Sequence, residues 1–475
     1  MSEELYVKKE AWEVYWTLAI EPSRMNRKEL LLITAVALGT LLNPLNTTMI
    51  SVALARLQED FQLTFADISW LISTYYLASA IGQPVMGKWS DLFGRKRVFM
   101  LGLFLVTLSS SLAPLSPSYG WLIGFRIIQA IGSSALFPSG MGMIRSQITS
   151  RQARALGILS IFSSTSAAFG PSLGGLLLHY GDWPLIFLCN FPFIAGSFVL
   201  AWKVFPNDAA SSGRASDMDW RGVMLFCVAI FMWLLFFLSL SDGYSLWKLA
   251  ASVILTVWFY RFELRRSKPF IDVVFLRQNI NVTLIYAQFI LTNVAFYSIM
   301  FGIPSYLQRV QRMDPQQTGL VMLSIAGFSV LVTPIVGRWI DRRGSKPSLI
   351  VGTACVIAGA LLLLLIQDDA SVFTIFLALC VLGIANGFNN LGMQTSLYDF
   401  VTKEETGVAS GLFMTSRFIG TILSSSLLAA LFGESITTAH LHSMAWTCAG
   451  LGVLMFVLTL RLPQVNRPVA HEKAG

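Results

Sequence analysis

Residues 87–96 read Gly-Lys-Trp-Ser-Asp-Leu-Phe-Gly-Arg-Lys, and residues 337–346 read Gly-Arg-Trp-Ile-Asp-Arg-Arg-Gly-Ser-Lys. Both follow the pattern Gly-basic-Trp-x-Asp-x-x-Gly-x-Lys, and the copies are 250 residues apart, which is 337 minus 87. A complex pattern that recurs within one chain indicates a duplicated structural unit. The repeat therefore predicts that this chain is built from two related halves.

The sequence around both copies is strongly apolar. Of its 475 residues, 55% are hydrophobic and only 13% are charged, whereas soluble proteins carry roughly 25% charged residues. Long apolar runs cross bilayers as helices, because a helix satisfies its own backbone hydrogen bonds in lipid. We predict an all-α membrane protein of about 14 transmembrane helices. The predicted spans are 30–54, 67–87, 98–115, 119–141, 155–178, 184–205, 220–240, 245–262, 281–305, 316–338, 347–366, 371–395, 406–432 and 440–461.

The repeat divides these spans into blocks. Each copy follows the second span of a six-span block, and residue 30 corresponds by the same offset to residue 280, next to the ninth span. Two six-helix halves with a helix pair inserted between them account for this spacing. The predicted organisation is an N-terminal segment 1–29, a half 30–205, an inserted pair with its connectors 206–280, a half 281–461 and a tail 462–475.

The distribution of positive charge predicts the orientation. The formal net charge is +8, and most of the 34 Lys and Arg residues fall on one side of the predicted spans. Cytoplasmic loops are rich in these residues, so we predict that both termini are cytoplasmic in a multi-pass protein of the bacterial inner (plasma) membrane. The basic composition then reflects topology and gives no support for a nucleic-acid partner. Four basic residues face outward in this arrangement: Arg56, Lys248, Arg309 and Arg312.

Cofactor and targeting signals are not found in the sequence. The five cysteines lie within predicted spans and the four histidines are scattered, so no metal site or disulfide is predicted. No phosphate-binding loop supports ATP-driven transport. Residues 1–29 lack the apolar core of a cleavable signal peptide. This segment lies on the membrane surface, or is a disordered tail, or precedes a true start at Met25.

The repeated loop motif has a physical interpretation as a gate. The glycines allow helix backbones to approach closely and the chain to turn, while the aspartates can meet a helix N-terminus or an arginine of the other half. Such a bond would form in one conformation and break in another. A tight loop that carries positive-inside charge is the alternative interpretation. The predicted gate residues are Gly87, Asp91, Gly94, Arg95, Gly337, Asp341 and Gly344.

Further motifs occur in a recognisable order. Residues 126–132 read Arg-Ile-Ile-Gln-Ala-Ile-Gly, residues 170–175 read Gly-Pro-Ser-Leu-Gly-Gly, and residues 417–420 read Arg-Phe-Ile-Gly. Together with the loop motif, this set resembles the major facilitator superfamily, specifically its fourteen-spanner drug/proton antiporter branch. The likeness covers residues 30–461. It implies two six-helix facilitator halves that export a solute by alternating access, with proton antiport as the driving reaction.

The fifth span carries the sequence that resembles the antiporter signature. We expect Gly170, Pro171, Gly174 and Gly175 to kink this span and let it pack tightly against the opposite half. The resemblance associates this element with the direction of export, and a purely structural kink is the alternative.

The chain departs from the family pattern at an important position. The branch usually carries an acid in span 1 where this sequence has Asn46, and no Asp or Glu lies well inside any predicted span. Arg126 and Arg417 are the two deep charges, and such residues are functional candidates because burying them is costly. Without an acid at position 46, the substrate brings the negative charge to Arg126, or Arg126 donates to amides and carbonyls and serves packing, or an acid reaches in from a span end.

Polar side chains concentrate in the spans that line the cavity of facilitator folds. The resemblance implies that spans 1, 4, 9 and 12 form this lining. Buried amides in lipid need partners, so they mark either a cavity or contacts between helices. The predicted substrate-binding residues are Asn43, Asn46, Arg126, Gln129, Gln288, Asn293, Asn386, Asn389, Asn390, Gln394 and Arg417.

These observations predict a secondary active exporter of small amphipathic compounds rather than an enzyme. If protons drive transport, the titrating acid must be found elsewhere, and Asp67 and Asp399 are the candidates. The rival within transport is an anionic or lipid-like solute attracted by Arg126 and Arg417. An intramembrane enzyme or a sensor would need a cluster of acids and histidines or a sizeable soluble domain. The sequence leaves the substrate and the oligomeric state open.

Overall fold

The computed structural model describes residues 26–63, 65–148, 152–208, 218–239, 245–313, 315–367, 370–432 and 436–464. The alternatives for residues 1–25 and most of the predicted tail lie outside these ranges. The described secondary structure is helical throughout. The first helices are α2 (Arg27–Thr40), α3 (Leu42–Asp60), α4 (Phe65–Phe93), α5 (Arg95–Leu112), η1 (Ala113–Leu115), α6 (Tyr119–Gln147), α7 (Gln152–Gly181), α8 (Pro184–Leu188) and α9 (Asn190–Val204). The others are α10 (Trp220–Leu238), α11 (Leu246–Glu263), α12 (Val273–Gln278), α13 (Ile280–Arg309), α14 (Pro315–Arg343), α15 (Ser345–Leu363), α16 (Val372–Phe400), α17 (Thr406–Phe432) and α18 (Thr438–Arg461).

The all-α membrane architecture predicted from hydropathy is confirmed. Each predicted span falls on one helix or on consecutive helices. Within the described residues, ten helical segments are long and apolar enough to cross a bilayer. The helices α4, α7, α10 and α11 do not contribute to these ten, so the count of fourteen spans stays a prediction.

Glycines separate the helices at both copies of the repeated motif. Gly94 lies between α4 and α5 with φ of 105°, and Gly344 lies between α14 and α15 with φ of 81°. These angles belong to a region that residues with a side chain rarely adopt. Both copies of the motif therefore end one helix and start the next through the same backbone turn.

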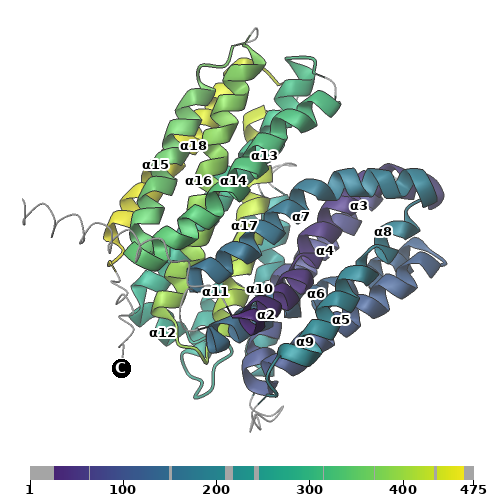
Figure 1. Cartoon of the computed structure of the whole chain (residues 1–475), viewed down its shortest axis with the longest axis vertical. Coiled ribbons are helices and arrows are strands. Elements are labelled where there is room, and N and C mark those ends of the chain that lie inside the picture. Colours follow the sequence, from purple (N-terminus) through teal and green to yellow (C-terminus); the bar gives the residue numbers. More distant parts are fainter. Residues whose placement is uncertain are drawn as a thin grey trace, which may run out of the picture.

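The helices form two groups that lie side by side (Figure 1). Helices α2–α9 pack mainly against one another, and so do α13–α18. The groups meet along two seams, where α4 packs against α17 and α7 packs against α14. The pair α10 and α11 pack together, and α10 also contacts both α4 and α17. Each seam thus joins the second helix of one half to the fifth helix of the other.

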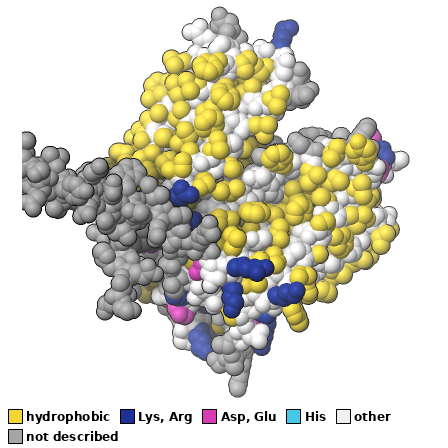
Figure 2. All heavy atoms as spheres, viewed as in Figure 1, with side chains coloured by type: hydrophobic (Ala, Val, Ile, Leu, Met, Phe, Trp, Pro, Cys, Tyr) yellow, Lys and Arg dark blue, Asp and Glu magenta, His cyan; other side chains and the backbone are white. Residues whose placement is uncertain are grey.

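The surface is consistent with a protein that is solvated by lipid. Figure 2 shows hydrophobic side chains covering much of both helix groups, while most of the visible Lys and Arg side chains gather near the lower end. Large apolar residues such as Phe104, Trp202, Leu331 and Leu365 are exposed on this surface. Exposed apolar area of this extent indicates a membrane-facing surface.

Candidate functional site: a polar cavity between two helix groups

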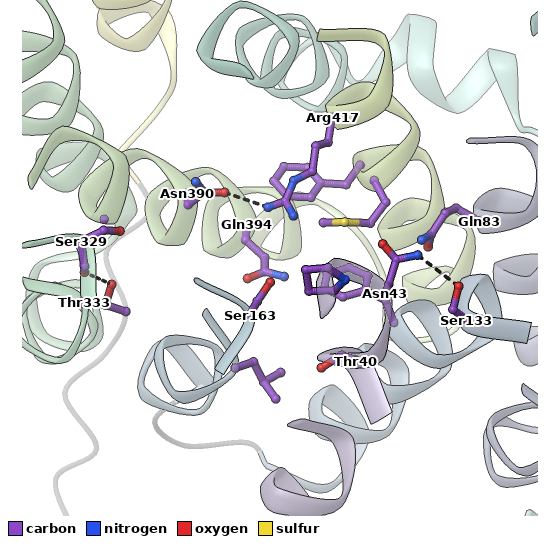
Figure 3. A pocket seen from close by; sticks show the side chains of 16 residues that line it. Thr40, Asn43, Gln83, Ser133, Ser163, Ser329, Thr333, Asn390, Gln394 and Arg417 are labelled. Atoms are coloured by element: carbon purple, nitrogen blue, oxygen red, sulfur yellow. Dashed lines mark hydrogen bonds between the residues drawn. The ribbon is translucent and has the colours of Figure 1, made fainter. Parts of the chain in front are cut away.

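A cavity lies between the two helix groups (Figure 3). The first group lines it with α2, α3, α4, α6 and α7, and the second with α14, α16 and α17. Helix α13, which contains the predicted span 9, supplies none of the residues that line it. The polar lining consists of Thr40, Asn43, Gln83, Ser133, Ser163, Ser329, Thr333, Asn390, Gln394 and Arg417.

Arg417 is the one charged residue among the described residues that line this cavity. Its Nη2 atom donates to Asn390 Oδ1 at 3.2 Å. Asn390 Nδ2 donates in turn to Asn386 Oδ1 at 2.7 Å, and Asn386 Nδ2 donates to Ser329 Oγ at 3.1 Å. Residues four apart share a helix face, so α16 presents both amides to α14 and α17 as the spacing predicted. This chain of bonds fixes the orientation of Arg417.

The first helix group contributes Asn43 to the opposite wall. Asn43 Nδ2 donates to Ser133 Oγ at 3.1 Å and to the Tyr75 hydroxyl at 3.3 Å. The Tyr75 and Ser133 hydroxyls are 3.1 Å apart. Gln394 of the second group reaches across the cavity, and its Nε2 lies 3.7 Å from Met141 Sδ in α6. Polar groups from both halves therefore face one space.

Arg126 does not line the cavity, although the sequence makes it a candidate. It is 1% exposed within the first helix group. Its Nη1 donates to Gln129 Oε1 at 2.6 Å, and its guanidinium lies 4.2 Å from the centroid of the Tyr75 ring. Among the described residues, no carboxylate lies within ion-pair distance of it. A tyrosine face and an amide take the place of an acidic partner.

Asn46 is part of the same buried network. Its Oδ1 accepts from Gln129 Nε2 at 3.2 Å and from Asn190 Nδ2 at 2.9 Å, and its Nδ2 donates to Leu42 O at 2.7 Å. Asn190 Nδ2 also donates to Ser110 Oγ at 3.0 Å. These contacts favour the interpretation in which Arg126 serves an internal polar network, because every neighbour here is neutral.

The cavity wall and the buried network also contain four residues that were not predicted from the sequence: Tyr75, Ser110, Ser133 and Asn190. A signal existed for Asn190, which is the sole amide in the predicted span 184–205. Amides at membrane depth require a partner and are therefore informative. Hydroxyl groups carry no comparable signal, because Ser and Thr can bond to their own helix backbone.

Three other predicted cavity residues lie at contacts between helices. Gln288 Nε2 donates to Thr459 Oγ1 at 2.5 Å and so joins α13 to α18. Asn293 Nδ2 donates to Phe289 O of its own helix at 2.7 Å. Asn389 is fully buried and packs against Gly352 of α15. Gln288 therefore joins two helices, as in the alternative interpretation, whereas Asn293 bonds to its own helix and neither amide atom of Asn389 has a hydrogen-bond partner among the described residues.

One end of the seam between the halves is closed by the first copy of the motif. The two oxygens of Asp91 accept from Gly407 N at 3.1 Å and Val408 N at 3.0 Å, at the start of α17. A carboxylate at this place satisfies free N–H groups and interacts favourably with the helix dipole. A Cβ atom on Gly87 would overlap the Gly407 carbonyl, so the two backbones touch here.

Two arginines of the first half reinforce this closure. Arg95 donates to Gly142 O at 2.7 Å and to Lys403 O of the second half. Arg145, which the sequence analysis did not single out, is buried against the second half. It donates to four oxygens there, those of Tyr398 O, Val401 O, Thr402 O and Thr406 Oγ1. The closed end is thus held mainly by donors of the first half and acceptors of the second.

The second copy of the motif occupies the other seam. Helix α14 contains Gly337, ends just after Asp341, and packs against α7, which begins at Gln152. Residues 149–151, which precede α7, lie outside the described residues. Asp399, a candidate titrating acid, accepts from Ser345 Oγ at 3.2 Å just beyond the Gly344 turn. The side chain of Asp67, the other candidate, lies outside the described residues.

The glycines of the antiporter-like element contact a different partner from the one expected. A Cβ atom on Gly170 would overlap the Thr48 side chain, and one on Gly174 would lie 3.0 Å from Met49 O. Both neighbours belong to α3 of the same half, whereas we expected the opposite half. Helix α7 does pack against α14 of the opposite half, as expected, but elsewhere along its length, where a Cβ atom on Gly157 would lie 3.5 Å from Thr333. Gly175 faces open space, and the side chain of Pro171 lies outside the described residues.

A buried acid lies at the end of the inserted helix pair. Glu263, just beyond the predicted span 245–262, is 1% exposed. It lies beside Asp219, whose Oδ2 is 3.6 Å from Arg266 Nε. Burial, and then the charge of Asp219, raises the pKa of Glu263 to about 7. The backbone N–H groups of the loop before α12, together with Lys88, oppose this rise.

The raised pKa of Glu263 predicts a pH-dependent stability. The folded protein retains a proton that an unfolded chain releases near pH 4.5, so stability falls as pH rises from about 4.5 to about 7. We expect Glu263→Gln to remove this fall and to stabilise the protein at pH 8 by on the order of 2 kcal/mol. Thermal unfolding in detergent at pH 5 and pH 8 measures the effect. The exposed Glu404→Gln is the control. If the stability of Glu263→Gln fell with pH as steeply as that of the parent, the prediction would be contradicted.

A model of the Major Facilitator Superfamily matches residues 36–425. The chain is 43% identical over 429 residues to a Bacillus subtilis protein named as an uncharacterized MFS-type transporter, YwoD. The alignment covers 90% of this chain and 93% of that relative.

More distant relatives carry names that describe a substrate. The chain is 28% identical to the multidrug resistance protein Stp of Mycobacterium tuberculosis, over 85% of this chain and 76% of the relative. It is 25% identical to the riboflavin transporter RibZ of Clostridioides difficile, over 87% of this chain and 90% of that relative. The crystal structure of the human organic anion transporter MFSD10 superposes with a TM-score of 0.68 at 15% identity, over 92% of this chain and all of that one. This last likeness bears on the fold alone.

Proposed function

Because this chain belongs to the Major Facilitator Superfamily, we propose that it is a secondary active transporter that exports small amphipathic compounds by alternating access. The observation that carries the proposal is a polar cavity between two helix groups. Contacts between these groups close the space between them at one end. A binding site between two halves, closed at one end at a time, is the arrangement that alternating access requires.

The proposed orientation places the closed end in the cytoplasm. It carries the Gly94 and Gly344 turns and the basic residues that follow the motif, and positive charge favours the cytoplasmic side. With fourteen spans and both termini cytoplasmic, the conformation described here is closed toward the cytoplasm. The halves 30–205 and 281–461 then rock about the cavity, with the pair in 206–280 at their side.

The proposed cargo is a small amphipathic compound. The cavity offers amides and hydroxyls for hydrogen bonds, and Phe137, Leu159, Phe413 and Met414 form an apolar part of its wall. A relative named for multidrug resistance supports a drug-like substrate. The riboflavin transporter among the relatives has another substrate, so the family alone leaves the compound open.

Proton antiport is the proposed driving reaction, on the basis of the resemblance to the antiporter branch. Asn46 cannot titrate, so an acid other than a span 1 carboxylate has to carry the proton. Asp67 and Asp399 remain the proposed carriers. Asn46→Asp would place a carboxylate beside Gln129 and Asn190 and is the matched variant for this question.

Export assays in a pump-deficient bacterium test the proposal. Matched fluorescent amphiphiles are loaded into cells that express the parent chain, Asn46→Asp or no transporter, with and without a protonophore. We expect the parent to lower the retained dye, and the protonophore to abolish the difference. Retention equal to that of cells without transporter, despite normal membrane insertion, would refute drug-type export. Export that ignores the protonophore would refute proton coupling alone.

A further inference from the structure

We propose that the central cavity selects amphipathic compounds that carry a carboxylate, and that Arg417 binds this carboxylate. The inference rests on the proposed function, because it names the chemical class of the exported compound. It also separates the roles of the two deep arginines, which the sequence treats alike.

The charge of the cavity is the first argument. Arg417 is the one charged residue among the described residues that line it, and none of the ion pairs formed by the described residues involves this side chain. A guanidinium in a partly desolvated site attracts an anion strongly, because the local dielectric constant is low. A cationic compound would meet a like charge here without a carboxylate to offset it. The cavity therefore favours an anion over a cation.

The free donors of Arg417 are the second argument. Among the described residues, Nη2 alone has a hydrogen-bond acceptor, Asn390 Oδ1, whereas Nε is buried and lacks a partner there. Buried donors without acceptors are costly, and a carboxylate can accept two parallel bonds from one guanidinium. Figure 3 shows the Arg417 side chain reaching into the space between Asn390 and Asn43. A bound carboxylate would satisfy the unused donors from inside the cavity.

The rigidity of this arginine is the third argument. Asn390 is held by Asn386, which is held by Ser329, so three helices set the position of the guanidinium. The Cζ atom of Arg417 also lies 5.9 Å from the centroid of the Phe289 ring. That ring stacks on the Phe413 ring, with the two centroids 3.6 Å apart. A group held in advance loses little conformational entropy when the ligand arrives.

Arg126 differs from Arg417 in its position relative to the cavity. Arg126 is 1% exposed and lies against the Tyr75 ring and Gln129, outside the cavity lining. A substrate carboxylate in the cavity therefore meets Arg417 first. The aromatic side chains Phe137 and Phe413 provide contact for the apolar body of the same molecule.

The experiment compares compounds that share an apolar body and differ in charge. Each triplet consists of a carboxylate, its primary amide and an aminomethyl cation, built on naphthalene, anthracene and dansyl groups. Binding to the purified full chain is measured by equilibrium dialysis, and transport is measured in everted membrane vesicles. We expect the carboxylate to bind at least tenfold more tightly than the amide, and the cation to bind most weakly.

Variants of Arg417 identify the group responsible. Arg417→Gln is expected to weaken carboxylate binding about ten- to hundredfold, to leave amide binding within about threefold, and to remove the preference for the anion. Arg417→Lys is expected to keep part of the preference for the anion, because Lys carries the charge but lacks the paired donors of Arg. The exposed Arg261→Gln is the matched control. Size-exclusion profiles and melting temperatures establish that each variant is folded.

The outcomes separate this inference from the proposed function. Export of the amides or cations in preference to the carboxylates would refute carboxylate selection and leave the exporter standing. A preference for the anion that persists in Arg417→Gln would refute the assignment of Arg417. Failure of the folded protein to bind or move any member of the triplets would overturn both the selectivity and the proposed export.

Discussion

Arg145→Met is expected to release the closed end of the protein and to lower the ratio of closed to open conformations about 100-fold. Arg145 donates to oxygens on both the end of α16 and the start of α17. Losing these charge-assisted bonds across the seam costs about 3 kcal/mol in the closed state. In the proposed alternating-access cycle the halves separate at this end when it opens, which breaks these bonds, so the equilibrium is expected to shift by the full amount.

Spin labels at Arg97 and Lys403 measure this shift. Both side chains are exposed at the closed end, one on each half, and the distance between the labels is expected to lengthen and broaden in Arg145→Met. Arg277→Met, an exposed arginine before α13, is the matched control. An unchanged distance distribution in Arg145→Met would mean that this contact does not hold the halves together.

Gln129→Met is expected to be among the most destabilising single changes in the first half, by about 3 kcal/mol. Gln129 Oε1 is the hydrogen-bond acceptor of the Arg126 guanidinium, and its Nε2 donates to Asn46 and Ser110. Its removal leaves a buried positive charge with the Tyr75 ring but without that acceptor. An uncompensated buried charge is far more costly than a buried apolar group.

A double-mutant cycle isolates this effect. Arg126→Met alone leaves the Gln129 oxygen unsatisfied and is expected to cost less, about 1–2 kcal/mol. The double variant Arg126→Met with Gln129→Met removes both groups and is expected to recover at least half of the loss. Unfolding free energies from titration with SDS in mixed micelles provide the measurement. Additive losses in the double variant would contradict a charge–amide interaction between these two residues.

The features that could be predicted from the sequence depend on local composition and on spacing. Long apolar runs predicted the helices, since a helix satisfies its own backbone hydrogen bonds in lipid. The repeat near Gly87 and Gly337 predicted two matching turns. The spacing of Asn386 and Asn390 predicted one shared face, which these residues use to position Arg417. Family membership followed from the order of the motifs and is confirmed by the family match.

Other features depend on which helices become neighbours. Hydropathy cannot distinguish an amide that faces a cavity from one that faces another helix, since both are buried and polar. Asn390 thus faces the cavity while Asn389, its neighbour, packs against Gly352. Arg145 and Asn190 gained their roles only from partners far away in the chain.

The two deep arginines illustrate the same division most clearly. The apolar sequence around both arginines predicts that they are buried, and Asn46 shows that span 1 has no acid at the position where the family pattern places one. Their different environments follow from packing alone. Helices α3, α4 and α6 enclose Arg126 with neutral groups of its own half, whereas α17 lies at the seam and turns Arg417 toward the space between the halves. Side-chain direction relative to that seam is a property of the assembled helices, because it depends on which face of each helix its neighbours cover.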